Sequence, residues 1–211
     1  MPVRAAGVCG LLAFVTFNVA WIAGGLAQQD AFSSADDNIS DLGALTADVP
    51  WLYNQIGANL TGLLVLGLGL GLWRALTPDV AGRLGAAALV VAGTSTFLSG
   101  IFRLDCQGID PGCENDSWHS TAHKIASGFN GAALLIAPLI LAFAFRRIPA
   151  WRDSWLPTLA VLPAVLAANL IFSILGDGAA VRAGSVISVL WIAFVGARLI
   201  QRGERHGAAQ S

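Results

Sequence analysis

Long apolar stretches and short polar stretches alternate along the chain. Six of the apolar stretches reach the roughly 20 residues that a helix needs to cross the hydrocarbon core of a bilayer. The pattern therefore predicts an all-α fold, a polytopic membrane bundle of six transmembrane helices in one domain of residues 1–200, followed by a polar tail of residues 201–211. The predicted spans are residues 7–27, 51–76, 84–102, 121–145, 155–175 and 180–200.

The composition supports a membrane protein. Hydrophobic residues make up 55% of the 211 residues and charged residues only 12%, whereas soluble domains carry about 25% charged residues. The formal net charge of −1 gives no reason to expect a nucleic-acid partner. The first apolar stretch, residues 7–27, is longer than the roughly 7–15 residues of a signal-peptide core, so we expect a retained helix.

The basic residues predict how the bundle is oriented. With the N-terminus inside, nine of the twelve Lys and Arg residues fall in cytoplasmic segments, and ten of the thirteen acidic residues fall outside. Cytoplasmic segments of membrane proteins carry an excess of Lys and Arg. We therefore expect both termini to be cytoplasmic, in a multi-pass protein of the cytoplasmic (inner or plasma) membrane. The basic residues expected outside are Arg103, Lys124 and Arg182.

The most polar segment, residues 102–126, joins the third and fourth spans on the predicted outer side. It holds Cys106 and Cys113, with a turn-forming Asp-Pro-Gly sequence between them. Thiols outside the cytoplasm tend to be oxidised, and closing so short a loop stabilises a fold by about 2–3 kcal/mol. The segment therefore predicts a structural disulfide. A redox-active pair is the alternative, although the spacing differs from Cys-x-x-Cys.

Two histidines of this segment are candidate metal ligands. His119 and His123 are four residues apart where the fourth span begins, so they share one helix face. That spacing allows two imidazoles to bind one metal such as zinc, and Asp105 could supply a further ligand. The Glu found between the histidines of zinc-protease helices is missing. The alternative is that both histidines hydrogen-bond to loop carbonyls and acids.

Three more residues complete the predicted outer polar group. Arg103 and Lys124 could hold the phosphate or carboxylate of a lipid headgroup, or pair with nearby acids. Asp41, in the first outer loop, either caps a short interfacial helix or reaches the same site. Asn59, in the outer half of the second span, could line the floor of an outward-facing cavity. The candidate ligand-binding residues are therefore Asp41, Asn59, Arg103, Asp105, His119, His123 and Lys124.

Short motifs along the chain resemble those of a known membrane family. They are Ile-Ser-Asp-Leu-Gly-Ala starting at Ile39, Phe102 with an acid three residues later, and His123 followed by small residues. Over about residues 10–200, the chain resembles the bacterial and archaeal membrane proteins that contain domain of unknown function 998.

The resemblance implies six spans and a polar face, but no reaction. Matched position by position, it directs attention to Asp41, Asp105 and His123. The chain departs from the family pattern at two places. Arg103 stands where many members have Pro, and the two cysteines are additions.

Three classes of function fit these observations. The best fit is a binding or accessory protein whose outward polar pocket takes a lipid headgroup or small ligand, with membrane lipid as its partner, because the polar residues form one cluster without a complete catalytic set. The alternative is a metal-dependent membrane hydrolase in which His119, His123 and Asp105 hold a metal that activates water. A small-solute transporter is the second alternative, disfavoured by the few ionisable residues within the spans.

Overall fold

The computed structural model describes residues 2–28, 32–77 and 79–208, with side chains up to residue 202. Within these residues the chain is all-helical and forms no strand. Six helices are long and apolar enough to cross a membrane, so the six-span prediction is confirmed. They are Val3–Leu26, Leu52–Ala75, Val80–Ile101, Trp118–Arg147, Pro149–Phe172 and Asp177–Arg202.

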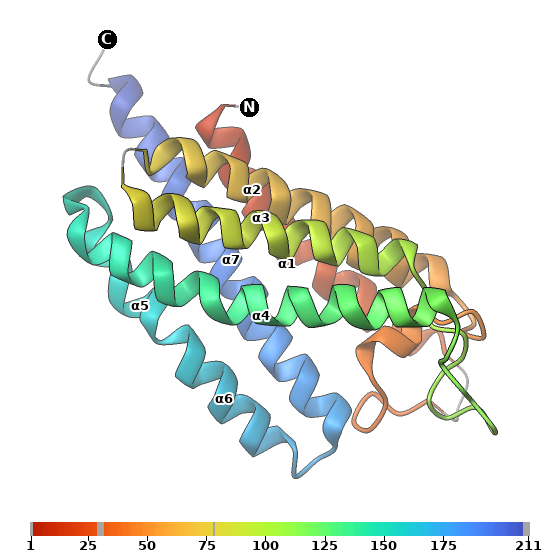
Figure 1. Cartoon of the computed structure of the whole chain (residues 1–211). Helices are drawn as coiled ribbons and strands as arrows, with labels where there is room; N and C mark the ends of the chain where they lie inside the picture. The colour runs from red at the N-terminus through yellow and green to blue at the C-terminus, as the bar shows by residue number, and fades with distance from the viewer. Residues whose placement is uncertain (1, 29–31, 78, 209–211) are drawn as a thin grey trace.

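The spans pack as a bundle that is closed on all sides but one (Figure 1). Its main helices are α1 (Val3–Leu26), α2 (Thr61–Ala75), α3 (Val80–Ile101), α4 (Trp118–Arg147), α6 (Val161–Phe172) and α7 (Asp177–Ala208). Helix α1 packs between α2 and α7, α3 packs between α2 and α4, and α6 packs along α7. Helices α4 and α6 scarcely touch, so the weak side of the bundle lies between them.

The two ends of the bundle differ in character (Figure 1). Both chain termini lie at one end, which we call the terminal end, and the long polar loops lie at the other, the loop end. Which end faces the cytoplasm stays a prediction. Helix α7 continues to Ala208, well into the segment expected as a tail, and residues 209–211 lie outside the described residues.

The terminal half of the bundle has a packed apolar core. Its largest fully buried side chains include Leu68, Leu141, Phe145 and Leu199. The ring of Phe145 stacks on that of Trp151, with centroids 4.6 Å apart. Large side chains that interdigitate in this way leave little free space within this core. A second cavity, of about 1110 Å³, lies at the terminal end and is lined by residues that include Arg4, Arg74, Trp151, Arg152, Asp153 and Arg202.

Small residues bring the helix backbones close together elsewhere. A Cβ on Gly62 of α2 would lie 2.7 Å from the carbonyl oxygen of Gly93 on α3, and the reverse substitution would meet the carbonyl of Gly62 at the same distance. Only glycine allows this approach, which is a common way for helices to associate in lipid. The close contact fixes α2 against α3 and thereby positions the polar residues that follow on both helices.

The second span begins with a π-helix, η2 (Leu52–Leu60), and continues as α2. The side chain of Thr61 donates to the carbonyl of Ile56 (3.1 Å), five residues earlier, at the junction. A wider helical turn changes which residues share a face, and such segments are frequent at functional sites. In this span it places Tyr53, Gly57 and Thr61 on the face that looks into the bundle.

The fifth span is broken by proline. It starts with a 3₁₀-helix, η3 (Pro149–Ser154), and a short helix, α5 (Trp155–Leu159), before α6 begins at Val161. Pro163 cannot donate a hydrogen bond to the carbonyl of Leu159, and its ring crowds that carbonyl, which explains the break. The segments η3 and α5 pack against α4, whereas α6 leaves α4 and follows α7.

Candidate ligand-binding cavity

A cavity of about 370 Å³ occupies the loop half of the bundle. Its volume falls within the range of roughly 300–1,000 Å³ that is usual for small-molecule sites. All six spans contribute to its wall, and residues 38–40 of the first loop cover its loop end. We call these three residues the roof.

Polar and apolar side chains divide the lining. The polar part includes amides and hydroxyl groups from both loops and spans: Asn38, Ser40, Tyr53, Thr61, Thr96, Ser99, Ser127, Asn130, Asn169, Ser185 and Ser188. The apolar part includes Val65, Leu134, Leu135, Val165, Val189 and Ile192. No Asp, Glu, Lys, Arg or His is among the described lining residues. The chamber is therefore uncharged and combines hydrogen-bonding groups with a larger apolar surface, which suits a hydrogen-bonding group that carries an apolar extension.

Several lining hydroxyl groups are ready to bind a ligand. Ser127, which is exposed, and Ser185, which is partly buried, form no side-chain hydrogen bond within the described part of the chain. Asn130 accepts one bond, from the hydroxyl of Thr96 (3.0 Å). These side chains stand on α4 and α7, two of the helices that line the cavity.

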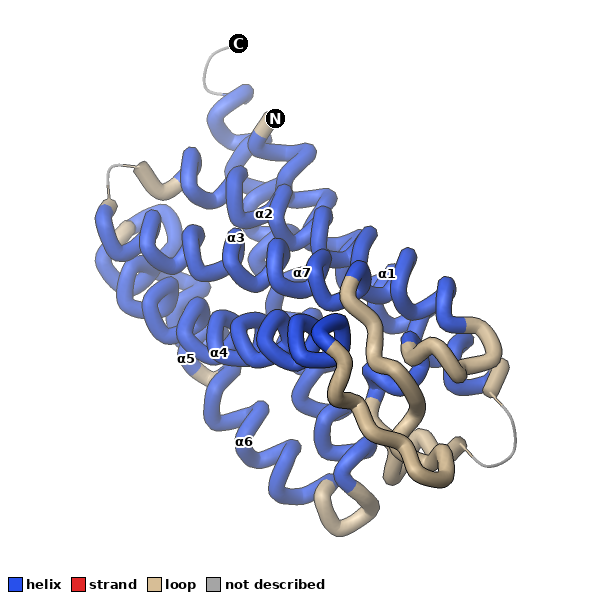
Figure 2. Tube along the Cα trace, turned by 45° about the vertical axis from the view of Figure 1, so that its right-hand side comes forward, coloured by secondary structure: helices blue, strands red, loops and turns tan. Residues whose placement is uncertain are grey.

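The cavity opens sideways between α4 and α6. Figures 1 and 2 both show these helices diverging towards the loop end. On α4, a Cβ added to Gly128 or Gly131 would meet nothing within 4 Å, and Gly131 lines the cavity. Leu135, which also lines it, is 37% exposed. The opening therefore faces the region that lipid tails would occupy around a membrane-spanning bundle.

The roof leads into a short 3₁₀-helix, η1 (Ile39–Gly43), to which two of its three residues belong. The buried amide of Asn54 on η2 donates to the carbonyl of Gly43 (2.8 Å). The Asp41 carboxylate is buried and accepts the backbone N–H of Gly108 from the next loop. Burial raises the pKa of Asp41 above its usual range, more than the amide of Gly108 lowers it. Asp41 thus joins two loops and does not line the cavity.

Arg182 lies next to the roof. It stands on α7, is 5% exposed, and donates through Nη1 to the carbonyl of Asp37 (2.6 Å). Its guanidinium carbon lies 5.8 Å from the ring centroids of both Trp21 and Phe32. A buried guanidinium within a span is costly and marks a functional site by default.

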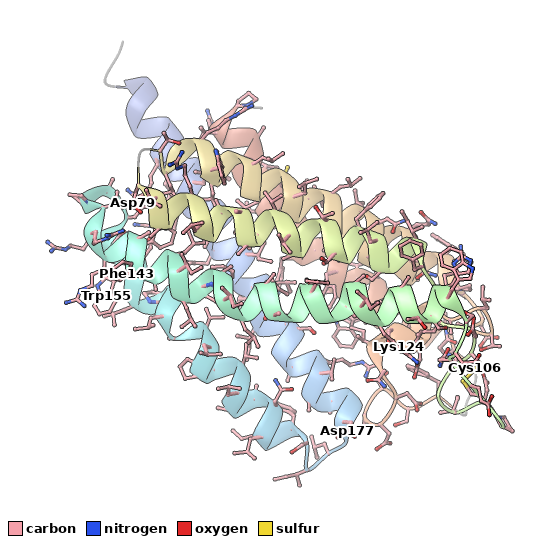
Figure 3. All side chains as sticks on the ribbon, viewed as in Figure 1. Asp79, Cys106, Lys124, Phe143, Trp155 and Asp177 are labelled. Carbon is pink, nitrogen blue, oxygen red and sulfur yellow. A yellow bond between two sulfur atoms is a disulfide. The ribbon has the colours of Figure 1, made fainter. Side chains whose placement is uncertain are left out.

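The predicted disulfide is confirmed, since Cys106 and Cys113 are bonded. Figure 3 places Cys106 and Lys124 together at the loop end, far from Asp79, Phe143 and Trp155 at the terminal end. The loop is tied further by Asn115, whose side-chain oxygen accepts the backbone N–H groups of Asp105 (2.8 Å) and Cys106 (3.2 Å). We call this loop between α3 and α4, residues 102–117, the brace segment, because it ties down the start of α4.

Asp105 and Lys124 take part in this brace. Asp105 accepts from the backbone N–H (3.1 Å) and the hydroxyl group (2.6 Å) of Ser117, the N-cap residue of α4. These bonds, above all the one from the hydroxyl, hold the pKa of Asp105 below its usual range. Lys124 donates to the carbonyl of Asn115 (2.5 Å). Neither residue lines the cavity.

The two histidines lie in different surroundings. His123 is buried, with Nδ1 2.8 Å from the carbonyl oxygens of Ser99 and Phe102, and its Nε2 has no partner among the described residues. His119 is exposed, its ring centroid 3.6 Å from that of Trp118. Within the described residues, no three His, Cys, Asp or Glu side chains gather closely enough to hold a metal, so His119, His123 and Asp105 are not assembled as a ligand set.

The last two candidates also lie off the cavity. Arg103 is half-buried on the brace segment and does not line the chamber. Asn59 bridges η2 to α3, because with its amide oriented to satisfy both atoms it donates to the carbonyls of Phe97 (2.9 Å) and Asn54 (3.2 Å). Of the residues singled out in the sequence, none lines the cavity, although Asp41 adjoins its roof.

Sequence reasoning missed the lining residues themselves. Ser127, Asn130 and Ser185 are small polar residues of a common kind, and nothing in their spacing reveals that they face one chamber. A signal did exist for Arg182, because a basic residue inside a predicted apolar span is rare. In the orientation argument its charge indicates only the outer side of the membrane.

These features define a multi-pass membrane protein whose six-span helix bundle encloses a polar chamber. The chain belongs to the family described as protein of unknown function (DUF998), whose model matches residues 9–198. This match confirms the resemblance carried by the short sequence motifs. No curated protein and no solved structure matches the chain.

Proposed function

We propose that the protein binds an amphipathic molecule, with a membrane lipid as the leading candidate, in the cavity between α4, α6 and α7. The observation that carries the proposal is a chamber of about 370 Å³ whose uncharged lining combines amide and hydroxyl groups with apolar side chains. A polar headgroup would hydrogen-bond to side chains such as Ser127, Asn130 and Ser185. An apolar tail would lie against the aliphatic part and leave between α4 and α6.

The lateral opening supports this ligand class over a water-soluble solute. A soluble substrate would need a path to water through the roof, which is held in place by the bond between Asn54 and Gly43. A lipid can enter from the bilayer through the weakly closed face between α4 and α6. The described lining carries no acid, base or metal-binding group for a hydrolytic step, so a binding or accessory role fits best.

Two neighbouring glycines of α4 provide a matched test. Both Gly131→Leu and Gly128→Leu add a side chain where nothing lies within 4 Å, but only Gly131 lines the cavity. Leu favours a helix over Gly by about 1 kcal/mol, so both variants should fold. Binding of a fluorescent short-chain phospholipid to the detergent-purified protein would be measured by competition with unlabelled lipid.

We expect Gly131→Leu to weaken binding by roughly tenfold or more, since the added side chain takes up space at the α4 wall of the chamber. Gly128→Leu should bind like the unmodified protein. Mass spectrometry of extracts should find co-purified lipid in the unmodified protein and less in Gly131→Leu. Equal binding by both variants, or no binding by the unmodified chain, would rule out the cavity as a lipid site.

A further inference from the structure

Arg182 has an unoccupied hydrogen-bonding edge. Its Nη1 donates to the carbonyl of Asp37, but Nε and Nη2 are buried and have no partner among the described residues. In a guanidinium group, Nε–H and one N–H of Nη2 point the same way along one edge. That edge is the one that binds the two oxygens of a carboxylate or phosphate.

Two acids lie near Arg182, yet both use their carboxylates elsewhere. The Asp37 carboxylate accepts the backbone N–H of Ser33 (2.7 Å). The Asp41 carboxylate accepts the backbone N–H of Gly108. Arg182 forms no ion pair with any described residue. The two acids therefore offset the charge of Arg182 from a distance and leave its edge empty.

Such an arrangement is unfavourable without a ligand. A buried charge without a paired countercharge is destabilising, and the rings of Trp21 and Phe32 return only part of that cost. An apolar side chain of similar size would pack against the same rings at no electrostatic cost. The guanidinium is thus better explained by a bound anion than by stability.

The position of Arg182 connects it to the cavity. Its neighbours Val181 and Ser185 on α7 line the chamber. The roof begins directly after Asp37, whose carbonyl Arg182 holds. Arg182 itself does not line the cavity, but a ligand headgroup at the loop end would lie close to it, against Val181, Ser185 and the chain that follows Asp37.

We infer that Arg182 binds an anionic group of the cavity's ligand, a phosphate or carboxylate, through Nε and Nη2, so that the ligand is an anionic amphiphile. The inference rests on the proposed function, because it names the headgroup of the molecule in the same chamber. The first loop shifts to admit the anion. This shift breaks two hydrogen bonds. One joins Arg182 to the carbonyl of Asp37, and the other joins the backbone N–H of Ala179 to the carbonyl of Ala35 (2.7 Å).

Four probes separate the headgroup from the tail. They are dioctanoyl phosphatidylglycerol (anionic), dioctanoyl phosphatidylcholine (zwitterionic), dioctanoylglycerol (uncharged) and inorganic phosphate alone. Each is titrated into the detergent-purified full chain while the unfolding midpoint and the Kd are recorded. The variants are Arg182→Met, which removes the charge, and Arg182→Lys, which keeps the charge but lacks the paired Nε and Nη2 donors of the guanidinium. Arg103→Met is the matched control, since Arg103 also lies at the loop end but away from the cavity.

The unmodified protein and Arg103→Met should bind phosphatidylglycerol more tightly than dioctanoylglycerol. Arg182→Met should bind phosphatidylglycerol roughly ten- to hundredfold more weakly, the worth of hydrogen bonds to a charged group, and Arg182→Lys should fall between. Binding of dioctanoylglycerol should not change. Without ligand, Arg182→Met should unfold at the same temperature as the unmodified chain or higher, as expected when a buried charge is replaced by an apolar group.

The outcomes separate the two proposals. If all three lipids bind alike and Arg182→Met changes nothing, the cavity remains a lipid site and the inference about Arg182 is wrong. If only inorganic phosphate binds, and Arg182→Met abolishes its binding, the anion site stands and the proposed lipid function fails. If Arg182→Met lowers the unfolding midpoint and leaves every Kd unchanged, Arg182 is a structural clamp on the first loop. If Arg103→Met weakens phosphatidylglycerol binding instead, the headgroup lies on the brace segment.

Discussion

The carboxylate of Asp105 accepts two hydrogen bonds from Ser117, one from its backbone N–H (3.1 Å) and one from its hydroxyl group (2.6 Å). Ser117 in turn accepts the backbone N–H of Ser120 as the N-cap of α4 (3.2 Å). The acid that the family motif picks out therefore organises the start of the helix that forms one wall of the cavity. Through these bonds Asp105 positions the start of α4.

The lowered pKa of Asp105 predicts how stability changes with pH. Because these bonds favour the carboxylate, the stabilisation is fully present above the ordinary aspartate pKa of about 3.9 and is lost as the pH falls through the lower pKa of the folded state. Asp105→Asn should therefore unfold at a lower temperature than the unmodified chain at pH 7, and the difference should shrink towards pH 3. Thermal unfolding in detergent between pH 3 and pH 8 measures this.

Asp41 supplies the control with the opposite sign. Burial raises its pKa, so its carboxylate opposes folding, and the opposition disappears as the pH falls and the group is protonated. Asp41→Asn should remove that part of the pH dependence and leave the part due to Asp105. If Asp105→Asn keeps the same deficit at every pH, its bonds to Ser117 are not the source of the effect.

The disulfide predicts a stability loss that leaves the cavity intact. Replacing Cys106 and Cys113 together by Ser opens a short loop, which should lower the free energy of unfolding by about 2–3 kcal/mol. The hydrogen bonds of Asn115 to Asp105 and Cys106 should still hold the segment near α4. Phospholipid affinity should therefore change by less than about threefold. A dithiothreitol-treated unmodified protein serves as the comparison, and a loss of binding with retained folding would place the ligand on the brace.

His123 offers a test that separates a structural histidine from a metal ligand. Its Nδ1 lies between the carbonyls of Ser99 and Phe102, at the end of α3. His123→Ala leaves those carbonyls without this partner and should cost about 1–3 kcal/mol, while His123→Asn, whose side-chain N–H₂ can take the place of Nδ1–H, should recover part of it. Elemental analysis should give the same metal content for all three proteins. Stoichiometric zinc that is lost when His123 or His119 is replaced would instead support a metal-dependent hydrolase.

The fold could be predicted from the sequence more completely than the candidate site. Apolar length fixes a span almost by itself, because the bilayer sets the length that a helix must have. The disulfide could be predicted because Cys106 and Cys113 are close in sequence and share one loop. The cavity could not be predicted, because it depends on which faces of six helices meet. Nothing in the sequence distinguishes Ser127 and Ser185 from serines whose hydroxyl group bonds to a carbonyl of their own helix, such as Ser188.

The candidate residues lie outside the cavity for a physical reason. Charged and histidine side chains stand out in an apolar chain, but at the ends of spans they are also the groups that cap helices and join loops. Asp105, His123 and Lys124 all bond to the backbone or cap of neighbouring segments. Arg182 differs from them in that its unoccupied edge becomes visible only when its surroundings are known.

The break at Pro163 links one residue to the opening of the cavity. Without a backbone N–H at this position the helix cannot continue from α5 into α6, and α6 departs from α4, which α5 contacts. Pro163→Ala restores the donor, so the fifth span should become one straight helix that follows α4. The mouth between α4 and α6 should narrow, and phospholipid should bind and leave more slowly.

Spin labels measure the separation between α4 and α6 directly. With Cys9 replaced by Ser, labels on Gly128→Cys of α4 and Leu170→Cys of α6 stand at exposed positions on the two sides of the opening. Pulsed dipolar spectroscopy should give a shorter distance distribution in Pro163→Ala than in the parent. Pro157→Ala is the matched control, because Pro157 lies in the first turn of α5, where proline is tolerated. An unchanged distance in Pro163→Ala would mean that packing against α7, and not the proline, holds α6 away from α4.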